Sequence, residues 1–345
     1  MSEENIVVTG GGGFIGSHLT ETLLSLGNKV IVFDNIPLRQ SRNLEHVKNH
    51  KNLTFVQGDI NDKEALKVAI TKDVHKIFHL CAVVGVKKYC ADPLGVIDIN
   101  VGGTRNMLEL AQKHNIKVIF TSTSEIYGKN PKVPWAEDAD RVLGSTSLER
   151  WSYSTSKAVC EHMILGMHKS VGLPATIVRY FNVYGPRQAP YYIISQSIYK
   201  VLRNEQPLLY DKGNQTRCFT FIEDAVQGTI AAANSQKANG QVFNIGSDKE
   251  TTIRDAMELI IKISGKKIMW KDLDTQQHYG KKYEDIPRRV PDISKAKQLL
   301  GWKPKIPFEL GLKKTIKWCI ENSWWWKPLV KNNYQRKISK YSVKD

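Results

Sequence analysis

A tyrosine and a lysine are spaced so that together they could move a proton. Tyr153 and Lys157 are four positions apart in the stretch YSTSK, so both side chains would lie on one face of a helix. An ammonium group near a phenol favours the phenolate, and Tyr153 could then act as a base near neutral pH. The pair therefore predicts removal of a proton from a substrate hydroxyl.

Hydroxyl groups stand at the end of the predicted strand that precedes this helix. The strand, residues 117–124, ends with Ser122, Thr123 and Ser124, and Glu125 follows directly. Ligands of parallel α/β proteins bind at the carboxyl ends of the strands, so these hydroxyls should face a bound molecule. The strand end and the tyrosine–lysine pair thus form one candidate site.

Glycines separate the first predicted strand from the first predicted helix. Gly10, Gly13 and Gly16 lie in TGGGGFIG, where the absence of a Cβ permits a tight turn and lets a pyrophosphate rest on the helix N-terminus. Asp34 ends the next strand, 18 residues after Gly16. A carboxylate there can accept hydrogen bonds from ribose hydroxyls and would repel a 2′-phosphate, which favours NAD over NADP. Asp59 could contact the adenine, or it could simply cap its own loop.

The elements that must position these residues alternate between strand and helix. We expect strands at 5–9, 29–34, 53–59, 76–83, 117–124 and 175–181, with helices at 14–26, 62–70, 93–113 and 153–170. Such alternation with short links predicts a Rossmann-type α/β fold, a doubly wound parallel sheet covered by helices on both faces.

Beyond residue 185 the rhythm changes, and prolines and glycines become frequent. We expect helices at 192–203, 223–234, 252–264 and 308–322, and strands at 217–222 and 241–245. The predicted organisation is an NAD-binding domain with the catalytic residues at 1–183, a smaller mixed α/β substrate-binding domain at 184–326, and a basic tail at 327–345.

Composition limits the class of protein. The 345 residues are 41% hydrophobic, contain no apolar run long enough to span a membrane, and begin without the basic and apolar segments of a signal peptide. Five scattered cysteines suggest reduced thiols and a cytoplasmic location. We predict no metal site. The net charge of +16 is widely spread, which favours small anionic substrates over nucleic acid.

Three consecutive tryptophans, 324–326, precede a tail with six lysines or arginines and one acid. Aromatic and basic residues together could anchor a helix in a membrane interface. We favour the alternative, in which the tryptophans pack on the body of the protein or on a second subunit, and expect no membrane association.

The chain resembles the extended short-chain dehydrogenase/reductase family of nucleotide-sugar epimerases, dehydratases and decarboxylases. The resemblance spans nearly the whole chain and is carried, in the family's order, by TGGGGFIGSH, VFDN, GDI, HLCA, INVGGTRNML, STSEIYG, YSTSK, RYFNVYGPRQ, RCFTFIED, FNIGS and RRVPDISKAKQLLGWKP. It implies a nucleotide-sugar substrate, expected to be UDP-linked, NAD as cofactor, and a homodimer that pairs the helices at 93–113 and 153–170.

The resemblance also assigns roles to residues. Thr123 and Ser124 would orient the sugar, Tyr153 would remove the hydroxyl proton, and Lys157 would support Tyr153 and the cofactor; Glu125 completes the catalytic set. The cofactor residues would be Gly10, Gly13, Phe14, Ile15, Gly16, Asp34, Asn35, Asp59, Ile60, Leu80, Ala82, Asn100 and Lys157. The substrate residues would be Tyr89, Ser124, Asn182, Arg187, Arg217 and Arg289. As an alternative, Arg217 or Arg289 could pair with a local acid such as Glu223 or Asp285.

Oxidation of the sugar at C4 would give a 4-ketone, and the next step separates the possible reactions. Family dehydratases carry Asp-Glu where this chain has Ser124-Glu125, which argues against dehydration. If C6 is a carboxylate, the ketone is a β-keto acid and can lose CO₂ with little more than positioning. We favour a UDP-hexuronate decarboxylase, with a UDP-sugar 4-epimerase as the alternative. A non-catalytic NAD-sensing protein is disfavoured because Ser124, Tyr153 and Lys157 are all present.

Overall fold

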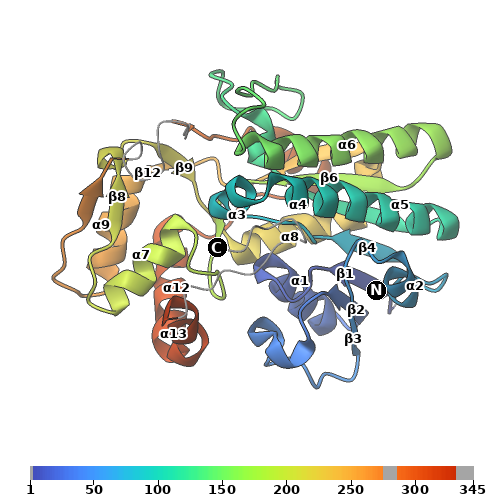
Figure 1. The fold of residues 1–345 in the computed structure, drawn as a ribbon, viewed down its shortest axis with the longest axis horizontal. Coiled ribbons are helices and arrows are strands. Elements are labelled where there is room, and N and C mark those ends of the chain that lie inside the picture. The colour runs from blue at the N-terminus through green and yellow to red at the C-terminus, as the bar shows by residue number, and fades with distance from the viewer. Residues whose placement is uncertain (1–2, 275–285, 332–345) are drawn as a thin grey trace.

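Seven parallel strands form the central sheet of this computed structural model, which describes residues 3–274 and 286–331. The strand order is β11-β6-β5-β4-β1-β2-β3, and Figure 1 labels β6, β4, β1, β2 and β3 in that sequence. The bounds are β1 Asn5–Thr9, β2 Lys29–Asp34, β3 Leu53–Gln57, β4 Lys76–His79, β5 Lys117–Thr123, β6 Ala175–Tyr180 and β11 Gln241–Ile245. The sheet confirms the predicted Rossmann-type α/β fold.

Helices cover both faces of the sheet because its apolar side chains alternate between two layers. Ile6 and Val8 of β1 join a core cluster with α1, whereas Val7 joins the cluster on the opposite face. Helices α1 (Phe14–Ser25) and α8 (Ile222–Asn234) belong to the first layer; α2 (Lys63–Ala69), α5 (Gly103–His114) and α6 (Trp151–Val171) belong to the second (Figure 1). Burial on both faces leaves the carboxyl ends of the strands as the edge at which a ligand can bind.

The long helix expected at 93–113 is present but is not uniform. It consists of α4 (Pro93–Ile97), a π-helical segment (Asp98–Gly102) and α5. The widened turn brings Asn100 into the core, where its Oδ1 accepts from the amide of Val83 at 3.0 Å and its Nδ2 donates to Ser156 Oγ at 2.9 Å. π-helical turns often occur at functional sites, and here the turn ties the end of β4 to the helix that carries Tyr153.

The C-terminal part contains α7 (Ile193–Leu202), α9 (Ile253–Ile263), α11 (Ser294–Leu300), α12 (Phe308–Glu321), α13 (Ser323–Lys331) and three two-stranded sheets. These sheets pair β7 (Val183–Tyr184) with β10 (Thr220–Phe221), β9 (Thr216–Cys218) with β12 (Glu250–Thr252), and β8 (Leu208–Tyr210) with β13 (Lys271–Leu273). Two elements within 184–326 belong to the central sheet and its cover: helix α8, described above, and one strand. Strand β11 lies within 184–326 but completes the central sheet beside β6, because its residues Phe243 and Ile245 are fully buried.

The tryptophan run packs on the body of the protein, as favoured from the sequence. Trp325 and Trp326 are each 3% exposed, and the ring of Trp326 stacks on Tyr199 with 5.0 Å between centroids. Trp324 is 52% exposed. Most of the predicted basic tail, from residue 332, lies outside the described residues. Across the part of the chain that the structure describes, no helix is both long and apolar enough to cross a membrane.

Candidate active site

The loop between β1 and α1 has the close backbone contacts that the glycine pattern predicted. Gly10 adopts a φ of +70°, and a Cβ there would lie 2.9 Å from the backbone nitrogen of Cys81. A Cβ at Gly16 would lie only 2.2 Å from the carbonyl oxygen of Gly10. Gly13 is the N-cap of α1, which begins at Phe14. The loop therefore folds tightly over the N-terminus of a helix, the arrangement that binds a phosphate group.

Asp34 is fixed at the end of β2 by the backbone of two loops. Its Oδ2 accepts from the amide of Gly12 at 3.0 Å, and its Oδ1 accepts from the amide of Ile36 at 3.0 Å. The carboxylate is thus held beside the phosphate-type loop, where it can receive ribose hydroxyls. The hydroxyl oxygen of buried Ser41, 2.9 Å from the position of a Cβ on Gly12, has no hydrogen-bond partner among the described residues. An orphaned buried hydroxyl at this place fits a polar dinucleotide ribose.

The other predicted cofactor residues line the neighbouring strand ends. Ile60 is buried and lies against Gly103 at the start of α5. Asp59 accepts from the amide of Asn61 at 2.9 Å, so it does cap its own loop, as the alternative proposed. Asn35 is exposed, and Leu80 and Ala82 are partly exposed beyond β4.

Tyr153 lies in the buried centre of the candidate site. Its ring stacks on Tyr89 at 5.5 Å with an angle of 6° between the planes. Burial raises the pKa of Tyr153 well above its usual range, the negative charges of neighbouring groups such as Glu125 raise it further, and a hydrogen bond with Thr123 lowers it. The contact with Thr123 places the phenol at the end of β5, as predicted.

The groups that set the pKa of Tyr153 do not show the lowering expected from the Lys157 ammonium. The Lys157 ammonium donates to the carbonyl oxygen of Thr121 at 2.8 Å and lies 4.5 Å from the ring centroid of Phe120. Burial lowers the pKa of Lys157. Desolvation is the largest influence on the pKa of Tyr153 in this structure, and the lowering of that pKa by the Lys157 ammonium stays a prediction.

Glu125 is a largely buried carboxylate, 13% exposed, held between two arginines. Its Oε1 accepts from Arg289 Nη1 at 2.6 Å and its Oε2 accepts from Arg150 Nη2 at 3.1 Å. Burial acts to raise the pKa of Glu125, but the two guanidinium groups outweigh it and lower the pKa to about 2. Glu125 is therefore ionised at neutral pH. The alternative that Arg289 pairs with Asp285 lies outside the described residues.

Arg150 is a site residue that sequence reasoning missed. It is 3% exposed and stands immediately before α6, three positions ahead of Tyr153. Residues three apart on a helix lie on nearly the same face, so this spacing was an available signal. Together Arg150, Arg289 and Glu125 make a buried charged cluster beside the phenol.

Asn182 follows β6 with an unusual backbone. Its φ is +37°, and its buried Oδ1 has no hydrogen-bond partner in the part of the chain that the structure describes. The hydroxyl oxygen of Ser122, at the end of β5, is likewise buried and without a partner, and Ser124 is 3% exposed. Buried polar atoms without partners are rare in folded proteins and often belong to sites that bind ligands. The structure thus leaves hydrogen-bonding capacity at the strand ends where substrate was predicted.

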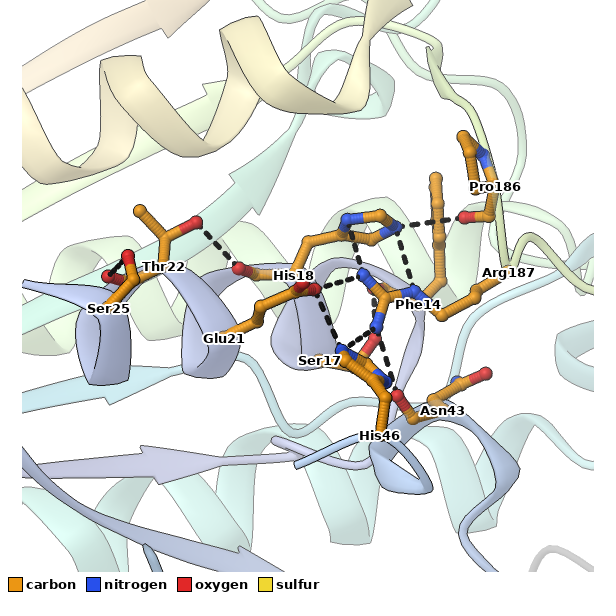
Figure 2. Close-up of polar contacts among 10 residues, drawn as sticks. All are labelled: Phe14, Ser17, His18, Glu21, Thr22, Ser25, Asn43, His46, Pro186 and Arg187. Carbon is orange, nitrogen blue, oxygen red and sulfur yellow. Dashed lines mark hydrogen bonds and ion pairs between the residues drawn. The ribbon is translucent and has the colours of Figure 1, made fainter. Parts of the chain in front are cut away.

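The remaining two predicted arginines have different surroundings. Arg217 is 8% exposed on β9, where its Nη1 donates to the carbonyl oxygen of Thr216 at 2.8 Å. Arg187 donates to Glu21 Oε2 at 2.6 Å and to His18 Nδ1 at 2.7 Å, so it joins α1 to the loop after β7 (Figure 2). Arg187 therefore has a structural role, and its contact with substrate stays a prediction.

The fold and the comparisons with known proteins together define a class of protein: a Rossmann-type enzyme that modifies nucleotide sugars. A family model described as GDP-mannose 4,6 dehydratase matches residues 7–315. The chain belongs to this family, which confirms the resemblance drawn from the motifs.

Relatives of the chain include several kinds of nucleotide-sugar enzyme. The chain is 40% identical over 323 residues to UDP-N-acetyl-alpha-D-glucosaminuronate decarboxylase of Bacillus cytotoxicus, covering 92% of this chain and 98% of the relative. It is 35% identical over 315 residues to UDP-glucuronic acid decarboxylase 1 of Xenopus tropicalis, covering 91% and 71%. A UDP-glucuronic acid 4-epimerase mutant of Bacillus cereus, solved with a UDP-sugar and NAD, matches with a TM-score of 0.82 at 30% identity, covering 92% and 99%.

Proposed function

We propose that the chain binds NAD and decarboxylates a UDP-linked hexuronate through a 4-keto sugar. The observation that carries this proposal is the cluster of Arg150, Arg289 and Glu125 beside Tyr153. Arginine is well suited to bind a carboxylate through paired hydrogen bonds. A hexuronate brings such a carboxylate at C6, whereas a neutral hexose has none. The names of relatives at 35–40% identity point to the same substrate class.

NAD, when bound, would accept a hydride from C4 of the sugar. Tyr153 would take the proton of the C4 hydroxyl, with Ser124 and Thr123 orienting that oxygen. The C5–C6 bond would then break, CO₂ would leave, and the electron pair of that bond would pass to the C4 carbonyl oxygen before C5 is protonated. The hydride would then return to C4 and Tyr153 would return its proton to the C4 oxygen, so that the product would differ from the substrate by one CO₂. Lys157 would hold the nicotinamide ribose, with its carbonyl partner Thr121 fixing the position of the ammonium group.

The ionisation of Glu125 disfavours dehydration. A 4,6-dehydratase needs an acid to expel the C6 hydroxyl. Glu125, with a pKa of about 2, carries no proton to donate near neutral pH. Decarboxylation needs no such acid, because a β-keto acid loses CO₂ once it is correctly positioned.

A panel of nucleotide sugars tests the proposal. The protein, supplied with NAD, is incubated separately with UDP-glucuronate, UDP-N-acetylglucosaminuronate and UDP-glucose. The masses of the products are then measured by mass spectrometry. We expect a loss of the mass of one CO₂ from a uronate. Arg289→Gln should abolish this loss, whereas Arg288→Gln should keep it, because Arg288 is exposed and pairs with Glu250. Unchanged uronate masses would contradict decarboxylation.

A UDP-sugar 4-epimerase is the second candidate. Solved 4-epimerases match the chain with TM-scores of 0.82–0.83 at 30–34% identity. Epimerisation requires the hydroxyls, Tyr153 and Lys157, which are all present. A product of unchanged mass but altered chromatographic retention would support this function.

We also propose that the protein is a homodimer located in the cytoplasm. Within each subunit, residues 184–326 would mainly bind the substrate. A shallow hollow of about 390 Å³ between α5 and α6 is lined by Leu108, Met163 and Met167 among others, which supports contact through these helices. Sedimentation should give a dimer, and Met167→Glu should shift it to a monomer. A monomeric wild-type protein would contradict this assembly, and recovery in a membrane or secreted fraction would contradict the location.

A further inference from the structure

The segment after β2 closes over the phosphate-type loop through one asparagine. Asn43 Nδ2 donates to the carbonyl oxygen of Gly12 at 2.9 Å, a bond that joins two segments 31 residues apart. Gly12 in turn donates its amide to Asp34. Asn43 therefore restrains the same glycine residue whose amide binds the candidate ribose carboxylate.

Two further segments hold Asn43 in place. Trp325 Nε1 donates to Asn43 Oδ1 at 3.0 Å across 282 residues of sequence. Arg187 Nη1 donates to the backbone carbonyl oxygen of Asn43 at 3.0 Å (Figure 2). Both polar atoms of the Asn43 side chain therefore form hydrogen bonds, Nδ2 with Gly12 and Oδ1 with Trp325 of helix α13.

The C-terminal helix α13 is bound to this segment in both directions. Arg42 Nη1 donates to the carbonyl oxygen of Trp325 at 3.0 Å, while the indole of Trp325 donates to the neighbouring Asn43. Trp326 anchors the helix elsewhere, because its Nε1 donates to the carbonyl oxygen of Cys319 at 2.8 Å. The consecutive tryptophans therefore have separate roles: Trp326 attaches α13 to the body, and Trp325 reaches the segment beside the glycines.

We propose that α13 keeps the glycine loop in the conformation that binds NAD. It does so through Trp325 and Asn43, so that Trp325 is a positioning residue for NAD binding. Without the indole donor, Asn43 Oδ1 loses its partner and the amide is free to turn away from Gly12. The glycine loop must then be ordered by the cofactor itself, which weakens binding. The inference rests on the proposed binding of NAD but not on the sugar reaction, because Trp325 contacts no residue of the catalytic set in the described structure.

Trp325→Phe keeps an aromatic ring and removes the donor. The net contribution of one hydrogen bond corresponds to roughly five-fold in a binding constant, so NAD should bind about five times more weakly. Trp324→Phe is the matched control, because Trp324 is 52% exposed. Among the described residues it donates only to Asn322. NAD affinity is measured by titration calorimetry on protein stripped of nucleotide, with UDP as a second titrant that should bind all three proteins equally.

A double-mutant cycle separates positioning from general loss of packing. In an Asn43→Ala background the Trp325→Phe change should have no further effect on NAD affinity, because its route to Gly12 is already removed. Arg42→Ala offers a second variant that leaves the indole in place, and it should weaken NAD binding in the same direction without weakening UDP binding.

The outcomes distinguish this inference from the proposed function. If the wild type binds NAD and Trp325→Phe binds it equally well, the positioning role is overturned while the cofactor proposal stands. Equal losses in the Trp324 and Trp325 variants, or full additivity with Asn43→Ala, would overturn it as well. If the wild type binds no NAD, both proposals fail.

Discussion

Lowering the pH from 7 to 5 should destabilise the protein through His79, a histidine that is buried as a neutral base. His79 is 1% exposed at the end of β4. Its Nδ1 lies 2.8 Å from the hydroxyl of Thr9, and its Nε2 lies 3.2 Å from the hydroxyl of Thr104. Thr104 donates its own proton to the carbonyl oxygen of Asn100 at 2.5 Å, so it must accept from His79 Nε2. The Nδ1 atom then accepts from Thr9, which leaves no place for a second proton.

Burial, aided by the positive charge of Lys157, lowers the pKa of His79 from 6.5 to about 3. Because the folded-state pKa is depressed, the unfolded chain binds more protons between pH 6.5 and 3. Stability is therefore fully present above the unfolded value and is lost as the pH falls through that window. From pH 7 to pH 5 the loss from this one group is about 2 kcal/mol. His18, whose pKa burial and Arg187 also lower to about 3, adds a loss of the same sign.

Urea unfolding at pH 7, 6 and 5 measures this loss. His79→Asn removes the titrating ring, so the variant should lose about 2 kcal/mol less than the wild type between pH 7 and 5. It will be less stable than the wild type at pH 7, because it loses the packing of the ring against Phe120. The pH dependence, not the absolute stability, is therefore the test. His50→Asn serves as the control at an exposed position. Equal losses in wild type and His79→Asn would refute the reasoning.

Three further substitutions test the candidate site. Gly16→Ala places a methyl group 2.2 Å from the carbonyl oxygen of Gly10, so NAD affinity measured by calorimetry should fall more than about ten-fold. Ser25→Ala, in the exposed last turn of α1, is the control and should keep the affinity. Normal affinity of Gly16→Ala would remove the loop from the site. Tyr153→Phe should reduce turnover by about 100- to 10,000-fold with NAD still bound, and normal turnover would exclude Tyr153 as the base. Asp34→Ala should weaken NAD about ten-fold and relax the exclusion of NADP, and unchanged selectivity between the two would contradict its ribose role.

Local patterns allowed the sequence to predict the cofactor loop. The close approach at Gly16 is to Gly10 within a single strand–loop–helix unit, and the end of β2 follows directly from its apolar run. Strand β11 was recognised as a strand, but its place beside β6 was not. That pairing brings together segments far apart in the chain, and the periodicity of one strand contains no information about its neighbour.

The charged cluster at Glu125 shows the same limit. Arg289 lies 164 residues from Glu125 in the chain, and no spacing rule connects them. Arg150 lies on the same helical face as Tyr153, so the sequence could have indicated it. The environment of Tyr153 could not be read in this way, because desolvation depends on every side chain packed around the phenol.

The ionised state of Glu125 limits which residue of the candidate site can transfer a proton. A carboxylate fixed by two arginines can neither donate a proton near neutral pH nor readily accept one, because protonation would leave two buried guanidinium groups without their counter-ion. In the proposed reaction, proton transfer would then fall to Tyr153, whose own pKa is raised by burial and by the Glu125 charge. A cationic ligand group near the phenol would lower that pKa again, and the oxidised nicotinamide ring of NAD carries such a charge. The phenol is therefore expected to become a base only in the complex with the oxidised cofactor, so that proton removal and hydride removal remain coupled in one site.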